Sequence, residues 1–112
     1  ITPVSATSTL YIKFLCTGCQ STSGGNGSMA ALFVDSTANA ISVFGVPNNG
    51  GNWQTTISLS AAVASSSTSA RTYKIRVGSG AGITFYVNGN ASGTRVFGGA
   101  SVAILEISEV EA

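Results

Sequence analysis

The ionisable side chains limit the chemistry open to this chain, which contains four carboxylates and no histidine. Histidine is the usual general base and the commonest metal ligand, so its absence removes the Ser-His and Cys-His nucleophile pairs. The carboxylates are Asp35, Glu106, Glu109 and Glu111. Cleavage of a glycosidic bond needs two carboxyl groups roughly 5 to 10 Å apart, whereas Glu106 and Glu109 would point to opposite faces of a strand. Asp35 paired with one glutamate remains a catalytic alternative, but we expect the chain not to be an enzyme.

Cys16 and Cys19 form a Cys-x-x-Cys motif, for which three interpretations are open. Two thiols at this spacing can form a redox disulfide or supply half of a zinc site. The chain has no further Cys or His to complete a zinc site, and no predicted helix begins at the motif to lower a thiol pKa. We favour two free cysteines that pack as small hydrophobic side chains at a strand end. A local disulfide and a metal ion shared between subunits are the alternatives, and we expect no metal or cofactor in the chain itself.

A loop rich in Asn and Gly precedes the only tryptophan of the chain. Gly and Asn tolerate positive φ, so the backbone can turn sharply between residues 47 and 52. An indole ring can stack on the C–H face of a sugar while neighbouring amides bond its hydroxyl groups. The alternative is that the ring anchors the loop onto the core. The candidate glycan-binding residues are Asn48, Asn49, Asn52, Trp53 and Gln54.

The composition excludes several classes of partner. Charged residues make up 8% of the chain, against about 25% in ordinary domains. The net charge is +1 and the five basic residues are scattered, so no concentrated basic footprint for nucleic acid is present. No apolar run approaches the ~20 residues of a membrane-spanning helix, so no membrane insertion is expected. A length of 112 residues predicts one domain.

Short runs of alternating apolar and polar residues, separated by Gly, Asn and Ser, predict an all-β fold of about eight strands. The expected strands are 9–16, 29–34, 40–46, 53–60, 73–77, 83–88, 94–97 and 101–110, and segment 61–70 is ambiguous between a helical turn and an extended crossover. Turns are expected at 17–20 and 35–37, and residues 88–90 can close a hairpin to the strand that contains Arg95. Turns at this spacing are typical of an antiparallel β-sandwich, here jelly-roll-like.

The first and last predicted strands carry apolar residues on both faces. In the last strand Leu105 and Ile107 share one face, and Val102 and Ile104 share the other. We expect one of these faces to meet another subunit, and a covering loop is the alternative.

Basic side chains form a second candidate contact. Lys74 and Arg76 project from one face of their strand, where they can bind anionic sugars or a carboxylate of another subunit. We favour a bidentate Arg76–carboxylate pair over a solvated face with weak surface pairs. The expected interface residues are Val102, Ile104, Arg76 and Glu109.

Three motifs in the last third of the chain match a known pattern: a Thr-Tyr-Lys-x-Arg-x-Gly strand, an x-Tyr-x-Asn-Gly hairpin and a Gly-Gly-x-Ser strand that ends in Ile-x-Glu-x. The matching residues are Thr72, Tyr73, Lys74, Arg76, Gly78, Tyr86, Asn88, Gly89, Gly98, Gly99, Ser101, Leu105, Ile107, Glu109 and Val110. In these residues the chain resembles the C-terminal head or trimerisation domains of bacteriophage tail fibres and tailspikes.

The resemblance implies a homotrimer at the tail tip of a virion, assembled in the host cytoplasm, which contacts host cell-surface glycans or another receptor. Because the chain begins with Ile1, we expect a piece of a longer polypeptide, with residues 1–8 as a connector and residues 9–112 as the head. A structural trimerisation cap without its own ligand, and a trimeric head of the tumour-necrosis-factor or complement-C1q type, are the alternatives.

Overall fold

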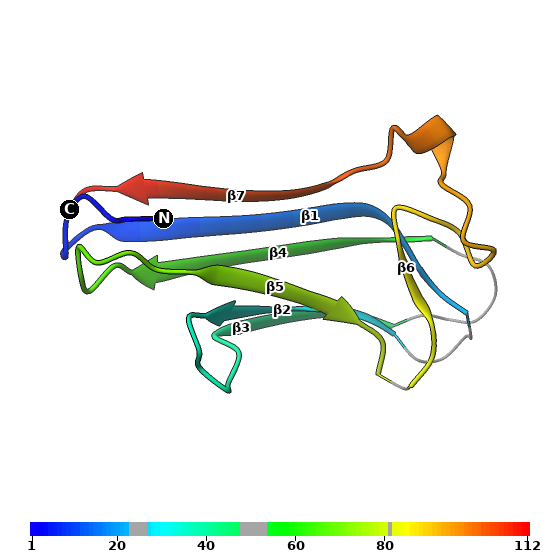
Figure 1. Ribbon diagram of the computed structural model, residues 1–112, viewed down its shortest axis with the longest axis horizontal. Coiled ribbons are helices and arrows are strands. Elements are labelled where there is room, and N and C mark those ends of the chain that lie inside the picture. The colour runs from blue at the N-terminus through cyan, green and yellow to red at the C-terminus, as the bar shows by residue number, and fades with distance from the viewer. Residues whose placement is uncertain (23–26, 48–53, 81) are drawn as a thin grey trace.

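The computed structural model describes residues 1–22, 27–47, 54–80 and 82–112. Within these residues, seven strands form two antiparallel sheets that pack face to face (Figure 1). The strands are β1 (Thr9–Ser21), β2 (Ser28–Val34), β3 (Ser42–Val46), β4 (Thr55–Ala64), β5 (Tyr73–Gly78), β6 (Phe85–Val87) and β7 (Ala103–Val110), and a short 3-10 helix, η1 (Phe97–Gly99), precedes β7. The predicted all-β antiparallel sandwich is confirmed, whereas the jelly-roll topology stays a prediction. No helix of the described part has the length and apolar character that a membrane crossing requires.

β1 is the central strand of the larger sheet. It pairs with β4 along one edge, and along its other edge first with β7 and then, through Cys19–Ser21, with β6. The second sheet has the order β3-β2-β5 and lies over β4 and β1. Every pairing within these sheets is antiparallel.

The core follows from the alternation of β1. Leu10, Ile12, Phe14 and Cys16 all point inward and are buried, against Leu32 of β2 and other buried residues of β2 and β4. Burying one such aliphatic side chain stabilises the fold by about 1.5–3 kcal/mol. The other face of β1 is not covered in the single chain, because Tyr11 and Leu15 are exposed.

β1 continues through residues 17–20, where the sequence predicts a turn. A bulge between Thr17 and Cys19 shifts the register there. Gly18 adopts φ of 144°, and a Cβ at this position would lie 2.8 Å from Oγ of Ser101. Both the dihedral angle and the close approach therefore require glycine.

The bulge brings Cys16 and Cys19 to the same face of β1. Without the extra residue, positions three apart on a strand would face opposite sides. Both cysteines are fully buried and joined by a disulfide. The free-thiol interpretation is therefore wrong, and the local disulfide is the alternative that the structure shows.

One further expectation needs correction, and one open alternative is decided in part. Residues 94–97 form no strand: Arg95 makes a single bridge to Gly89, and the chain then enters η1. The ambiguous segment after residue 60 continues β4 as far as Ala64. The closure of residues 88–90 toward Arg95 is confirmed by that bridge.

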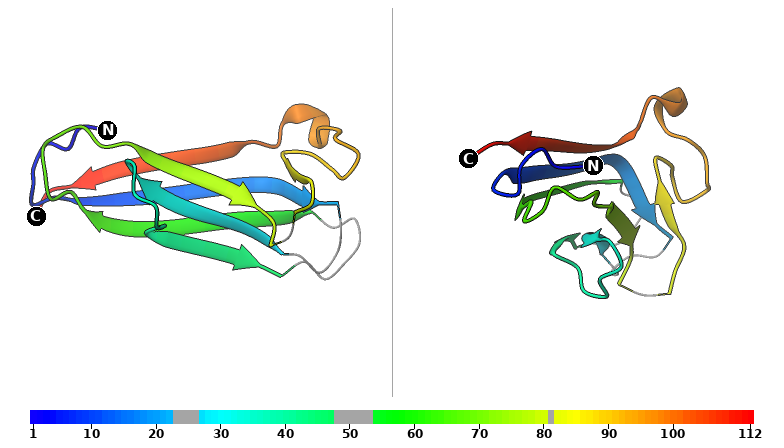
Figure 2. Two further views of the ribbon diagram at one scale, coloured as in Figure 1. Left: turned by 60° about the horizontal axis from the view of Figure 1, so that its bottom comes forward. Right: turned by 60° about the vertical axis from the view of Figure 1, so that its left-hand side comes forward.

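The molecule is elongated, with extents of 46 × 29 × 19 Å. Both termini lie at one end, whereas β6 and the segment that leads to η1 lie at the other (Figures 1 and 2). Residues 1–8 fold back along the terminal end, where the backbones of Ile1 and Arg71 exchange two hydrogen bonds. We call the opposite end, with β6 and residues 88–94, the distal end.

Reduction of the disulfide tests the bulge geometry. A crosslink that closes so short a loop contributes about 2 kcal/mol by chain entropy, so dithiothreitol should lower the unfolding free energy by about that amount. Guanidinium denaturation with and without reductant measures the change. The control is the double variant Cys16→Ala/Cys19→Ala, whose stability should not respond to the reductant. Labelling of both thiols by iodoacetamide in the unreduced unfolded chain would contradict the assignment.

Candidate functional site

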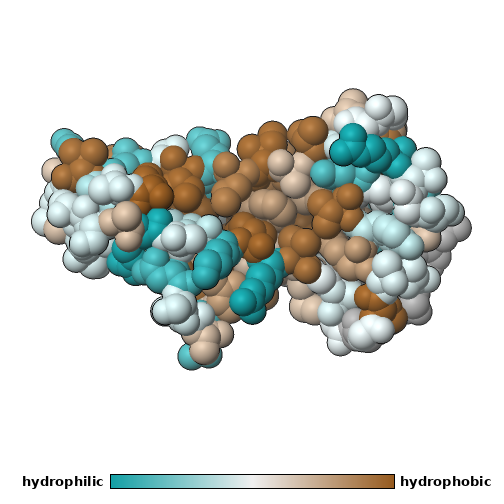
Figure 3. Space-filling model, in the orientation of Figure 1, coloured by the Kyte–Doolittle hydropathy of each residue, from teal (hydrophilic) through white to brown (hydrophobic). Residues whose placement is uncertain are grey.

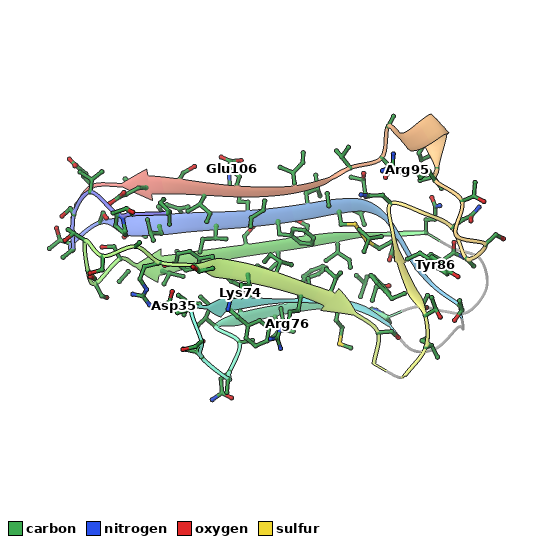
Figure 4. All side chains as sticks on the ribbon, in the orientation of Figure 1. Asp35, Lys74, Arg76, Tyr86, Arg95 and Glu106 are labelled. Carbon is green, nitrogen blue, oxygen red and sulfur yellow. A yellow bond between two sulfur atoms is a disulfide. The ribbon has the colours of Figure 1, made fainter. Side chains whose placement is uncertain are left out.

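A polar pocket of about 220 Å³ lies at the distal end of the sandwich. We call it the distal pocket. Three segments far apart in the sequence form it: the end of β1, the residue that precedes β4, and the loop after β6. It is lined by Gln20, Gln54, Asn90, Ala91 and Ser92. Figure 4 shows Tyr86 of β6 at this end of the molecule, directly across from Gln20 in the sheet.

Gln20 is the most buried polar residue of the pocket, with 1% of its surface exposed. Its Oε1 atom accepts a hydrogen bond from the backbone N–H of Ala91 at 2.9 Å. Its Nε2 atom is buried and has no hydrogen-bond partner among the described residues. A buried donor left unpaired costs about 1–3 kcal/mol, so the fold tolerates a defect at this position.

The loop after β6 is held by its own hydrogen bonds. Oδ1 of Asn90 accepts from the backbone N–H groups of Ser92 and Thr94, both at 3.0 Å. The backbone N–H of Asn90 donates to the carbonyl of Thr94 at 2.9 Å. Since the acceptor oxygen of Asn90 is engaged, its Nδ2 atom remains as a donor without a partner in the described part of the chain.

One of the five predicted glycan-binding residues lies in this pocket. Gln54 is exposed and lines the distal pocket. Asn48, Asn49, Asn52 and Trp53 lie outside the described residues. Sequence reasoning missed Gln20, Asn90 and Ser92. The predicted turn at residues 88–90 pointed to the loop, but nothing in the sequence pattern pointed to Gln20.

The carboxylate of Asp35 stabilises the fold by binding Arg71 and Thr72. Asp35 lies in the predicted turn after β2, where it binds Nε of Arg71 at 2.7 Å and accepts the N–H of Thr72 at 2.8 Å. The Thr72 hydrogen bond, followed by the Arg71 guanidinium, lowers the pKa of Asp35 below its usual value. The ion pair ties the end of β2 to the chain that enters β5.

Glu109 holds the N-terminal segment against β7. Its carboxylate accepts the N–H groups of Val4 at 2.9 Å and Ser5 at 3.2 Å, and the hydroxyl of Ser8. These hydrogen bonds, that of Ser8 first, lower the pKa of Glu109 below its usual value. Glu109 is thus engaged within its own chain, and the described residues contain no group of three or more potential metal ligands.

The other predicted interface residues lie on two different surfaces. Val102 and Ile104 are 49% and 50% exposed; Val102 directly precedes β7, and Ile104 lies opposite the exposed Leu15 on the side of the sheet that faces away from the core. The guanidinium of Arg76 lies 4.7 Å from the ring centroid of Phe33, a cation–π contact within the β3-β2-β5 sheet. Figure 4 shows Arg76 and Lys74 together on β5. A pair between Arg76 and a carboxylate of another subunit stays a prediction.

The outward side of the β4-β1-β7 sheet, which we call the outer face, carries exposed apolar side chains. Tyr11 is 45% and Leu15 38% exposed, and Leu15 lies directly opposite Ile104 in the sheet. A hollow of about 270 Å³ opens beside Leu15, lined in part by Ser58, Ser60 and Ile104. Figure 3 shows apolar residues at the surface over β7 and the strands beside it.

Comparison with known proteins gives no independent assignment: no protein-family model matches the chain, and no curated protein matches it. The fold and the two surfaces therefore define a β-sandwich with an apolar outer face and a polar distal pocket.

The role of Glu109 predicts an acid-dependent loss of stability. Because its folded pKa lies below the unfolded value of 4.5, the carboxylate stabilises the fold above that value. This contribution is lost as the pH falls through the folded pKa. Glu109→Gln should therefore lower the unfolding free energy at pH 7 and flatten its decline below about pH 5. Denaturant unfolding at a series of pH values measures both effects.

The matched control is Glu111→Gln, since Glu111 is an exposed carboxylate two residues away. It should leave the pH profile unchanged. Asp35, whose pKa is lowered in the same direction, supplies a residual acid dependence in both variants. An unaltered profile in Glu109→Gln would show that the N-terminal segment is held by other contacts.

Proposed function

We propose that this chain is the distal head of a phage tail fibre or tailspike, which trimerises the fibre and contacts glycans of the host cell surface. The observation that carries the proposal is the apolar outer face. Tyr11, Leu15 and Ile104, each between 38% and 50% exposed, gather on one side of one sheet, and Val102, which directly precedes β7, is 49% exposed. Apolar side chains concentrated in this way mark interaction surfaces, whereas single exposed ones need no explanation.

The shape and charge of the outer face suit a second copy of the same chain. The β4 side is built from small residues such as Ser58, Ser60 and Ala62, so a neighbouring sheet can approach closely. Lys13 and Glu106 lie opposite each other in the register but form no ion pair with each other in the described part of the chain. Copies related by rotation can pair the lysine of one with the glutamate of the next, which fixes the register between them.

Three copies, rather than two, follow from the resemblance to fibre heads. When one patch of each copy binds a different patch of the next copy, the copies form a closed ring if the rotation between neighbours permits it. The outer face of one copy, bound to a different patch of its neighbour, would supply such a contact. Burial of the outer face near the ring axis would then remove the exposed apolar side chains from water.

The placement of the termini and the distal pocket at opposite ends of the molecule fits a fibre tip. Both termini lie at one end (Figure 1), so an upstream shaft would join there. The distal pocket lies at the other end, where a fibre tip meets its target. Three pockets on one rigid head bind a surface together, so that effective concentration amplifies a modest single-site affinity. The pocket favours receptor binding over a purely structural cap.

The buried disulfide agrees with exposure on a virion. Disulfides persist in oxidising environments, which include virion surfaces, and are rare in the reducing cytoplasm. On this proposal Cys16 and Cys19 fold as thiols during assembly in the host, and after release dissolved oxygen accepts the two electrons and two protons that the thiols lose when the bond forms.

Light scattering tests the assembly. The native species should have the mass of three chains of 11.2 kDa each. Ile104→Asp places a carboxylate in the proposed contact and should dissociate the trimer. It should change the stability of the single chain by no more than about 0.5 kcal/mol, because the side chain is half exposed.

Val43→Asp is the matched control, because Val43 is an exposed β-branched residue of the other sheet. It should leave the trimer intact. A wild-type chain that stays a single subunit at high concentration would overturn the proposal, as would equal dissociation by both substitutions.

A further inference from the structure

We infer that the distal pocket binds one neutral sugar residue, with Gln20, Gln54 and Asn90 as the groups that bond its hydroxyls. The inference deepens the proposed function and rests on it in one respect, namely that the distal end of the head meets glycans. It adds the ligand class and the residues.

The strongest observation is the unpaired amide of Gln20. Three buried side-chain polar atoms of the described residues lack a partner: Gln20 Nε2, Ser28 Oγ and Tyr73 Oη. Of these residues, Gln20 lines the distal pocket. Its Oε1 atom is fixed by Ala91, so the amide cannot turn to exchange donor for acceptor without breaking that bond. The nitrogen is thus a buried donor without a partner in the described residues, and a ligand hydroxyl oxygen is a suitable acceptor for it.

The remaining polar groups of the pocket complement a hydroxylated ligand. Gln54 makes no hydrogen bond within the described residues and offers both a donor and an acceptor. Asn90 offers its Nδ2 donor, because its oxygen is engaged by Ser92 and Thr94. Vicinal hydroxyl groups each donate and accept, so a lining that mixes amide donors and acceptors can satisfy them together.

The lining also excludes other ligand classes. None of the described lining residues is ionised, so an acidic sugar or a phosphate would find no cation among them to pair with. Among the described lining residues, Ala91 alone is apolar, so this part of the lining offers little surface to a hydrophobic side chain of a peptide. A volume of about 220 Å³ lies below the roughly 300–1,000 Å³ of sites for larger ligands, which suits one sugar unit.

The pocket is already ordered before a ligand arrives. The hydrogen bonds of Asn90 hold the loop backbone, and Gln20 ties that loop to β1. Binding therefore costs little ordering of the chain, apart from the exposed side chain of Gln54.

Nuclear magnetic resonance of the side-chain amides tests the inference directly. The 15N-labelled chain is titrated separately with glucose, galactose, rhamnose and N-acetylglucosamine, and with glucuronic acid as the charged comparison. At least one neutral sugar should shift the side-chain signals of Gln20 and Asn90 saturably at concentrations on the order of 100 mM or below, since one weak site binds in the millimolar range. Glucuronic acid should bind more weakly than the neutral sugar that gives the shift.

Variants separate recognition from folding. Gln54→Ala should weaken sugar binding about 5-fold and leave the fold intact, because Gln54 is exposed. Gln20→Met keeps the length of the side chain and should abolish binding, with the fold checked by the same spectra. Asn39→Ala, at an exposed amide outside the pocket, should bind as the wild type does.

The outcomes distinguish the two proposals. The inference is overturned if no neutral sugar shifts these signals, if Gln54→Ala binds like Asn39→Ala, or if glucuronic acid binds more tightly. If the trimer still binds host-cell glycans in these cases, the proposed function stands and its site lies elsewhere. If the chain does not trimerise but the sugar titration succeeds, the fibre proposal fails and the pocket stands.

Discussion

The structure depends on one strand and on the single break in its alternation. Along β1, residues alternate between the core and the outer face until Gly18, where the bulge inserts one extra residue. The bulge turns Cys19 into the core, where it bonds Cys16. The carbonyl of Gly18 accepts the N–H of Gly89 at 3.2 Å, which brings the loop after β6 against Gln20. The core disulfide and the distal pocket therefore share one backbone irregularity.

The same strand explains why one face is left uncovered. β1 lies between β4 and β7, and the second sheet covers its inner side alone. β7 lies at the edge, so even Leu105, which faces the core side opposite Phe14, is 44% exposed. The three strands of the second sheet cover the inner side of the larger sheet incompletely at this edge, so on the proposed function contacts with further copies would bury Leu105 and Ile104.

The sequence predicted most strands, because a strand with one buried face has a regular pattern. It favoured free thiols over the disulfide and missed the role of Gln20, because both depend on contacts that the local pattern does not show. Period-two alternation identified most of the strands, because core packing selects it. Residues 94–97 also alternate, but Phe97 adopts φ of 50° and Gly98 of 62°, so the chain turns into η1 instead of extending. The pairing of Cys16 with Cys19 required a bulge that no pattern marks. Gln20 was missed because its burial is due to a loop 71 residues away, whereas exposed Gln54 was found by composition alone.

On the proposed function, the two halves of β1 have different roles, one in the outer face and one in the distal pocket. The first half, with Tyr11 and Leu15, offers apolar area, whose burial gives strong and non-directional association. On the same proposal, the second half offers the amide of Gln20, whose unpaired Nε2 donor gives direction and selectivity, whereas one small pocket alone supplies only modest affinity. If the proposed function holds, a head of this kind needs several copies to bind a surface firmly. Assembly through the outer face would then compensate for weak recognition at each pocket.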